Sequence, residues 1–257
     1  MPRSESSLAG MPEHALTLEA AARRLRDAVQ ALRFASPVHT VYNPLDYAWA
    51  AHAQYLSRFG ASPKPVVLLG MNPGPFGMMQ TGVPFGEVAL VRDWMGIDAP
   101  IHTPARQHPK RPIEGFACTR SEVSGRRLWG WARERFGTPQ AFFSRAFVVN
   151  YCPLVFLEES GRNLTPDKLP AAERAPLQQA CDEHLLAVLS ILQPQWAIGV
   201  GGYAAKRIAE VITALAPAHR PNTGQILHPS PASPLANRGW AEAVDAQLAA
   251  LGTPLSA

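Results

Sequence analysis

Four short segments, separated by longer stretches with helical periodicity, most restrict what this chain can fold into. Residues 66–69, 146–149 and 196–200 are apolar on both faces and too short for a helix, which is typical of strands buried inside a parallel sheet. Residues 225–227 form a fourth segment. Apolar residues recur at helical spacing over residues 17–34, 124–136, 171–192, 203–215 and 237–251. This alternation predicts an α/β fold with three layers, in which helices flank a central, mainly parallel four-stranded sheet.

The sequence shows no internal repeat, linker or second group of strands, so we expect a single domain. Residues 15–257 are assigned to it, and the polar residues 1–14 are expected to be a mobile N-terminal segment. No apolar run approaches the roughly 18 residues that span a bilayer, and the N-terminus lacks the apolar stretch of a secretory signal. These features predict a cytoplasmic protein without membrane contact.

Arginine supplies most of the positive charge, with 20 Arg and 4 Lys against 20 Asp and Glu. Its planar donors suit phosphate, which keeps a nucleic-acid partner open, although an Arg-rich genome would give the same bias. The three cysteines, Cys118, Cys152 and Cys181, are widely spaced and cannot form a four-cysteine site or an even disulfide framework. We therefore expect reduced thiols. The eight His are scattered, without H-E-x-x-H or paired carboxylates in the site loops, so we expect no metal, and no cofactor is predicted.

Three of the predicted strands end directly in unusual polar loops. Asn72 follows the first strand, Asn150 the second, and His228 the last. In parallel α/β sheets, ligands bind beyond the carboxyl ends of the strands, where such loops meet. We therefore expect these three side chains to converge on one site.

The loop at residues 70–78 is rich in glycine but is a poor phosphate cradle. A cradle needs successive backbone N–H groups, and Pro73 and Pro75 remove two of them. The loop is better interpreted as a stiff platform that fixes Asn72. The alternative is a simple turn in which the Asn72 side chain bonds only to its own backbone.

Each of the other candidate residues also has a functional and a structural interpretation. The amide of Asn150 can match the N3–H and O4 edge of uracil, or it can simply complete a turn. His228 can donate to a developing anion, or it can be a structural hydrogen-bonding residue. Phe85 lies among small and rigid residues and can stack on a planar ligand or pack in the core. Ser230 has no nucleophile-elbow sequence around it and is not expected to attack a substrate.

Taken together, the loop sequences resemble a known enzyme family. The strings LLGMNPGPFGMMQTGVPFGEV, VVNYCPLVF and ILHPSPASP are similar to those of the single-strand-selective monofunctional uracil-DNA glycosylases, family 3 of the uracil-DNA glycosylase superfamily. YNPLDYAW, VRDWMGI, HPKRP, SEVSG, SGRNLTP and ANRGW also resemble that family, in the same order. The resemblance covers roughly residues 38–252.

The resemblance implies a monofunctional DNA glycosylase of base excision repair, with a uracil-DNA glycosylase-like fold. Such an enzyme flips a uracil, or a 5-substituted uracil such as 5-hydroxymethyluracil, out of DNA and hydrolyses its N-glycosidic bond. Asn72 then positions the attacking water, and His228 stabilises the departing base. Asn150 reads the uracil edge and Phe85 stacks on it. The pocket is completed by Gly70, Met71, Gly74 and Met78, the last two near C5.

The resemblance also implies a DNA-binding wedge after His228. Its candidate residues are Pro231, Ala232, Ser233, Pro234, Leu235 and Arg238. The better-known relatives carry Arg-Asn where this chain has Ala232-Ser233, so less of the gap left by a flipped base would be filled. The expected partner is single- or double-stranded DNA containing uracil, and we expect a monomer with no obligatory protein partner.

Two rival functions remain at this point. A relative that prefers another deaminated base, such as hypoxanthine or xanthine, is disfavoured by Asn150, which complements uracil. A catalytically silent DNA-binding module would need neither Asn72 nor His228.

Overall fold

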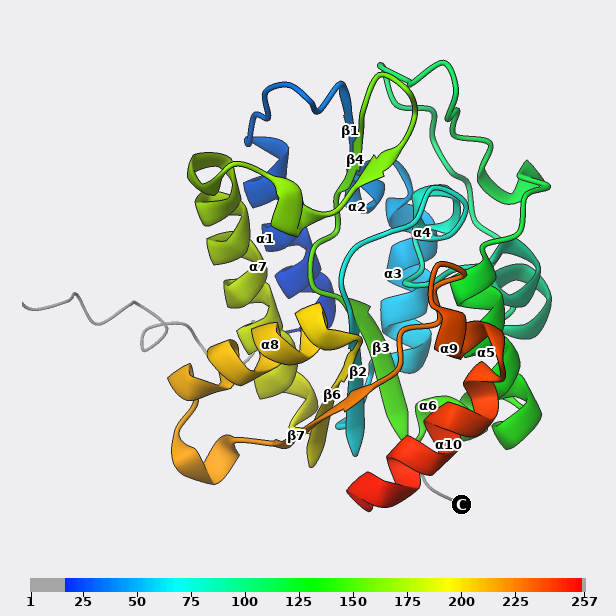
Figure 1. Ribbon diagram of the computed structural model, residues 1–257, viewed down its shortest axis with the longest axis vertical. Helices are drawn as coiled ribbons and strands as arrows, with labels where there is room; N and C mark the ends of the chain where they lie inside the picture. Colours follow the sequence, from blue (N-terminus) through cyan, green and yellow to red (C-terminus); the bar gives the residue numbers. More distant parts are fainter. Residues whose placement is uncertain (1–16, 256–257) are drawn as a thin grey trace, which may run out of the picture.

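The computed structural model describes residues 17–255 and has a four-stranded parallel sheet at its centre (Figure 1). The predicted mobile segment at residues 1–14 lies outside the described residues. The strand order is β3-β2-β6-β7, and every neighbouring pair is parallel. The strands are β2 (Val66–Gly70), β3 (Ala146–Asn150), β6 (Trp196–Val200) and β7 (Asn222–Ile226). The predicted α/β fold with a four-stranded sheet is therefore confirmed.

Helices cover both faces of this sheet, as the strand order requires. The chain leaves β2 for β3 at one edge and then crosses back for β6 and β7, so right-handed connections place the intervening helices on opposite faces. One face carries α1 (Leu18–Gln30), α7 (Ala171–Leu192) and α8 (Gly202–Val211) (Figure 1). The other carries α5 (Val123–Phe136), α6 (Pro139–Phe143) and α10 (Trp240–Leu251). None of the helices between residues 17 and 255 combines the length and apolar character needed to cross a bilayer.

The structure also contains elements that the sequence analysis did not predict. A small antiparallel sheet has the order β1-β4-β5, and several helices are short. These elements are β1 (Thr40–Tyr42), β4 (Val155–Leu157), β5 (Asn163–Leu164), α2 (Pro44–Tyr47), α3 (Trp49–Phe59), α4 (Met78–Thr81) and α9 (Pro234–Asn237). Single π or 3-10 turns occupy Leu90–Trp94, Gly115–Ala117, Pro166–Lys168, Ile212–Ala214 and Pro217–His219.

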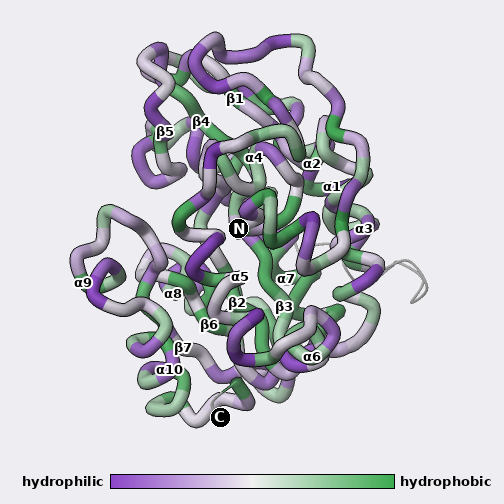
Figure 2. The backbone as a smooth tube through the Cα atoms, turned by 90° about the vertical axis from the view of Figure 1, so that its right-hand side faces the viewer, coloured by the Kyte–Doolittle hydropathy of each residue, from purple (hydrophilic) through white to green (hydrophobic). Residues whose placement is uncertain are grey.

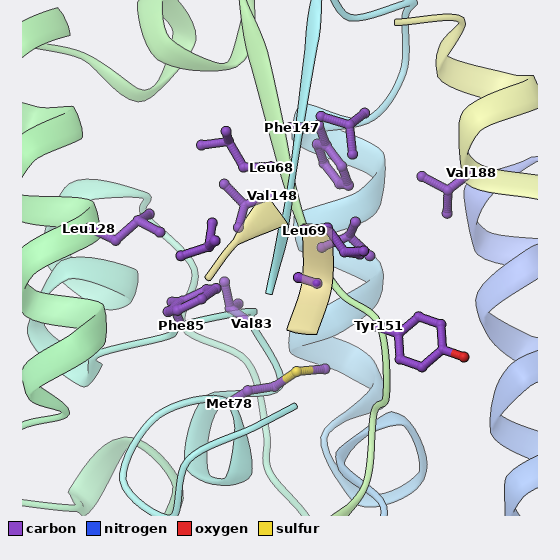
Figure 3. Close-up of a cluster of buried hydrophobic side chains, with 14 of the residues drawn as sticks. Leu68, Leu69, Met78, Val83, Phe85, Leu128, Phe147, Val148, Tyr151 and Val188 are labelled. Carbon is purple, nitrogen blue, oxygen red and sulfur yellow. The ribbon is translucent and has the colours of Figure 1, made fainter. Parts of the chain in front are cut away.

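The hydrophobic core follows the central strands and continues toward their carboxyl ends. Apolar segments gather along β2, β3 and β6 in the interior (Figure 2). Every residue of β2 and β3 is buried. Figure 3 shows Leu68 and Val148 of these strands in one cluster with Phe85 and Met78, which belong to the segment after β2. The residues around the strand ends are therefore held by the core itself.

Candidate active site

A cavity of about 350 Å³ lies at the carboxyl ends of the parallel strands. It brings together Asn72, Asn150, Phe85 and His228, from four separate parts of the chain. The other lining residues are Met71, Pro73, Gly74, Gly77, Met78, Glu122, Ser124, Asn163, Thr165 and Ser230. Asn72 and Asn150 lie close together because β2 and β3 are parallel and their last residues, Gly70 and Asn150, are paired.

Gly70 supports the cavity from behind and does not line it. A Cβ atom at this position would lie 2.4 Å from Oδ1 of Asn150 and 2.5 Å from Cε2 of Phe85. Both distances are far below van der Waals contact, so any side chain here would displace one of the two residues. Asn150 and Phe85 can therefore lie this close to the strand only because residue 70 is a glycine.

Asn72 is tied to the loop that follows the neighbouring strand. Its Nδ2 donates to the carbonyl oxygen of Leu154 at 3.3 Å, and a longer contact of 3.5 Å joins it to the carbonyl oxygen of Pro73. The shorter bond crosses to another loop, so the side chain does more than complete its own turn. Because the NH₂ group is engaged in this way, Oδ1 is the atom of the amide left to accept a hydrogen bond from a ligand.

The Asn150 amide is buried, and its oxygen is unsatisfied. Only 6% of the residue is exposed, and Nδ2 lies 3.3 Å from Sδ of Met78, a weak acceptor. Among residues 17–255, no donor reaches Oδ1 of Asn150. A buried polar atom without a partner is costly in free energy. This oxygen is therefore suited to receive a donor from a bound ligand.

Phe85 is held in an unusual backbone conformation beside these amides. Its φ of +53° lies in the left-handed region, which bulky residues rarely adopt. Helix α5 presses against its backbone, because a Cβ at Gly125 would lie 1.9 Å from the Phe85 carbonyl oxygen. The centroids of the Phe85 and His228 rings are 6.1 Å apart. The phenyl ring packs in the core (Figure 3), and the residue also lines the cavity.

His228 is half-buried, and one of its ring nitrogens is already engaged. The backbone N–H of Ser230 donates to Nδ1 at 3.1 Å. Burial lowers the pKa of the His228 imidazole from its ordinary value. A neutral imidazole that accepts at Nδ1 carries its proton on Nε2, so His228 offers a neutral hydrogen-bond donor.

Glu122 is a cavity residue that the sequence analysis did not single out, although it lies in the SEVSG string. It comes just before α5, and its carboxylate packs where Gly74 and Gly77 lack side chains. A Cβ at Gly74 would be 2.5 Å from Oε2 of Glu122. Burial raises the pKa of this carboxyl, although interactions with the backbone N–H groups of Ser124 and Phe76 lower it.

The segment after His228, residues 229–238, forms a rigid clip on the surface. Arg127 of α5 donates to the carbonyl oxygens of Pro229 and Ser230 at 3.0 and 3.2 Å, and to Oδ1 of Asn237 at 2.8 Å. Ser233 caps α9 by accepting from the N–H of Ala236. Five of the six candidate wedge residues are exposed, with Ser233 half-buried; the exposed five are Pro231, Ala232, Pro234, Leu235 and Arg238. Leu235 is 62% exposed, an unusual position for a large apolar side chain.

The titratable side chains of residues 17–255 include no group of three that could hold a metal ion. The three cysteines are free and buried.

Comparisons with known proteins agree with this architecture. A sequence model of the uracil DNA glycosylase superfamily matches residues 57–248. A structure of wild-type SMUG2 from Pedobacter heparinus has a TM-score of 0.62, at 16% identity, and covers 90% of this chain and 97% of that one. At this identity the likeness shows the fold alone.

Mammalian relatives are much closer in sequence. The mouse single-strand selective monofunctional uracil DNA glycosylase is 49% identical over 229 residues, which cover 89% of this chain and 81% of the mouse protein. The bovine protein of the same name is 48% identical and matches over 84% of its length. The resemblance seen in the loop motifs is therefore confirmed, and the chain belongs to the single-strand-selective monofunctional uracil-DNA glycosylase family of the uracil DNA glycosylase superfamily.

Proposed function

We propose that this protein is a DNA glycosylase that excises uracil from DNA by hydrolysing the N-glycosidic bond, leaving an abasic site for base excision repair. Family membership supports the reaction class. The observation that carries the proposal for this chain is the unsatisfied Oδ1 of Asn150, buried beside the Phe85 ring in a cavity that also contains Asn72 and His228.

Asn150 selects the base. Its free Oδ1 accepts from N3–H of uracil, and its Nδ2 donates to O4 in place of the weak contact with Met78. Cytosine presents an acceptor at N3 and a donor at the exocyclic amine, so both hydrogen bonds would be lost. Unpaired buried polar groups make such a mismatch costly. The base reaches this position by flipping out of the helix and stacking on Phe85.

Asn72 and His228 have different roles in the reaction. Oδ1 of Asn72 orients a water molecule toward C1′, because its Nδ2 is held by Leu154. As the C1′–N1 bond breaks, its electron pair leaves with the base and negative charge develops on O2. Nε2–H of His228 donates to that oxygen, and a fixed donor in a buried site stabilises the charge as it forms. The water oxygen then bonds to C1′ and loses one proton to solvent, and the departed uracil anion takes up a proton from solvent.

The same pocket accommodates 5-substituted uracils such as 5-hydroxymethyluracil. With Asn150 at N3 and O4, the C5 edge of the ring turns toward Met78, which touches the Asn150 amide. In the same loop, Gly74 and Gly77 also line the cavity, and the Glu122 side chain packs against both. Met71 lines the cavity beside Asn72.

The exposed clip after His228 contacts the DNA. Within it, Leu235 enters the gap left by the flipped base, as apolar wedges do in many DNA-bending proteins. The other contacts come from Pro231, Ala232, Ser233, Pro234 and Arg238. The substrate is DNA containing uracil, in either single or double strands.

Residues 15–257 act as one catalytic domain, as a monomer and in the cytoplasm. One core cluster extends from Leu18 to Leu255, which supports a single unit. Three free thiols are consistent with a reducing compartment.

Excision from labelled single-stranded oligonucleotides tests the proposal. Substrates carry uracil, 5-hydroxymethyluracil, cytosine or hypoxanthine, and abasic sites are cleaved with alkali. We expect cleavage at uracil and 5-hydroxymethyluracil. Cleavage at hypoxanthine alone would support the rival specificity, and binding without any cleavage would support a silent module. The variant Asn150→Ala, in the same assay, should lose excision of uracil.

A further inference from the structure

A second groove lies directly beside the catalytic cavity. It is open, has a volume of about 390 Å³, and shares the side chain of Glu122 with the cavity. Its lining includes Pro75 and Phe76, from the loop that carries Asn72, and Pro231 of the clip. Nucleotides adjacent to a base held in the cavity would therefore lie within reach of this groove.

The groove contains an arginine stacked on an aromatic ring. The guanidinium carbon of Arg120 lies 4.1 Å from the centroid of the Phe76 ring, and that of Arg111 lies 5.5 Å from it. Stacking uses the flat face of a guanidinium and leaves the N–H groups on its edge available. Arg120 is exposed, and no carboxylate within residues 17–255 forms an ion pair with Arg120, Arg111 or the adjacent Lys110.

This arrangement favours a phosphate over a nucleobase as the ligand. Arg120 already stacks on Phe76 at 4.1 Å, so a base would have to displace it to stack on the same face of the ring. The edge of a guanidinium matches two oxygens of a phosphodiester. Glu122, the acidic residue in the groove, packs against Gly74 and Gly77 on the side of the cavity.

We propose that this groove binds a backbone phosphate adjacent to the flipped nucleotide, with Arg120 as the ligand and Phe76 as the platform that orients its guanidinium. Arg111 supports the same platform from the preceding loop. This inference rests on the proposed action on DNA. It adds a phosphate subsite beside the catalytic cavity, lined by Pro75 and Phe76 of the Asn72 loop.

The test combines Arg120→Gln with oligonucleotides in which one phosphate at a time is made neutral as a methylphosphonate. The scan covers three positions on each side of a single uracil. Binding is measured by fluorescence anisotropy, and excision by single-turnover kinetics with enzyme in excess. Arg24→Gln is the matched control, because it removes the same charge from an exposed position on α1, on the other face of the sheet (Figure 1).

We expect Arg120→Gln to weaken binding about tenfold at low salt and to reduce the salt dependence by roughly 0.7 in the log–log slope on single strands. In the wild type, one methylphosphonate close to the uracil should weaken binding by a similar factor. The same methylphosphonate should not weaken the binding of Arg120→Gln any further. Phe76→Leu and Arg120→Lys should each lose part of this coupling, since one removes the platform and the other the planar group. The effect of Arg24→Gln on binding should be the same whichever phosphate is made neutral.

Two results would overturn the subsite: additive losses at every phosphate, or an equal effect of Arg24→Gln. The two proposals fail separately. If the wild type binds but does not excise uracil, the proposed function is wrong, while the anisotropy cycle still tests the groove. If excision is normal and no phosphate couples to Arg120, only the groove assignment is wrong.

Discussion

The backbone N–H of Ser230 donates to Nδ1 of His228 at 3.1 Å, and this bond fixes which ring nitrogen carries the proton. Burial lowers the pKa of the same imidazole, so the neutral form persists below the ordinary value of 6.5. Protonation would put a hydrogen on Nδ1 in addition to the one on Nε2, and this would break the contact with Ser230. The structure therefore favours a neutral donor through Nε2 across the physiological pH range.

For His228 we expect an NMR titration midpoint below 6.5, with the neutral ring protonated on Nε2. His228→Ala should slow single-turnover excision by about 100-fold or more, as removal of a preorganised donor does elsewhere, with a much smaller change in DNA affinity. A midpoint above 6.5, a proton on Nδ1, or a variant that loses affinity at an unchanged rate would contradict the proposed role.

Asn72→Ala should fold normally and lose at least about 100-fold in the rate of excision, because the attacking water is no longer oriented. Asn72→Asp is the informative companion. It keeps an acceptor for water but places a carboxylate oxygen against the Leu154 carbonyl, where Nδ2 now donates. We expect an intermediate rate for it, and matched thermal denaturation curves would verify folding. Near-wild-type excision by Asn72→Ala would show that the side chain only shapes its turn.

Leu235→Ala should reduce excision from double-stranded DNA more than from single-stranded DNA. The side chain is 62% exposed, and a flipped base leaves a gap only where neighbouring bases were stacked. The measurement is the ratio of single-turnover rates on matched duplex and single-stranded substrates. An unchanged ratio would remove Leu235 as the wedge.

Ala232→Arg tests the same gap in the opposite direction. Ala232 is exposed and too short to reach into a duplex, whereas an arginine could fill the gap and also contact a phosphate. We expect a gain on duplex substrates that exceeds any gain on single strands. Equal ratios for the wild type and Ala232→Arg would mean that the small residue is not limiting.

His52 should make the fold sensitive to acid. The ring is buried and within 2.8 Å of the carbonyl oxygen of Gly82, and burial lowers its pKa to about 4. Between pH 6.5 and 4 the unfolded chain binds a proton on this residue that the folded chain does not, so stability is full at pH 7 and falls with decreasing pH. The expected loss from this residue is about 2 kcal/mol at pH 5.

The variant His52→Gln serves as the control for that prediction, because glutamine keeps a donor without titrating in this range. Urea denaturation of both proteins at pH 7 and pH 5 measures the difference. The wild type should lose more stability than the variant. Parallel losses in the two proteins would place the acid sensitivity elsewhere.

Segments with a strong apolar pattern were predictable from the sequence, and segments without one were not. β6 and α7 have the predicted bounds, Trp196–Val200 and Ala171–Leu192. β7 is exposed along most of its length and buries only Ile226, so its apolar signal covered just one end. The small antiparallel sheet has strands of two or three residues, and its pairing of Thr40 with Leu157 depends on contacts far apart in the chain.

The same reasoning explains which cavity residues were predictable. Asn72, Asn150 and His228 follow strands, and parallel strands end at a common edge, so sequence position was enough to bring them together. Glu122 comes before a helix, and nothing in its local pattern indicates that the carboxylate fills the space beside Gly74 and Gly77. The two glycines were the available sequence signal for a side chain packed against this loop. The sequence does not say which side chain that is, because the loop and α5 come together only in the fold.

Helix α5 and the residue before it contact three of the loop segments that build this site. Glu122 packs against Gly74 and Gly77, Gly125 lies against Phe85, and Arg127 donates to the segment after His228. The loops therefore cannot be transplanted one by one. An engineer who grafts the Asn72, Phe85 and His228 segments onto another parallel α/β scaffold would have to carry this helix with them, in the same register. Directed evolution of substrate range should likewise find its compensating changes on this helix, and not only in the pocket.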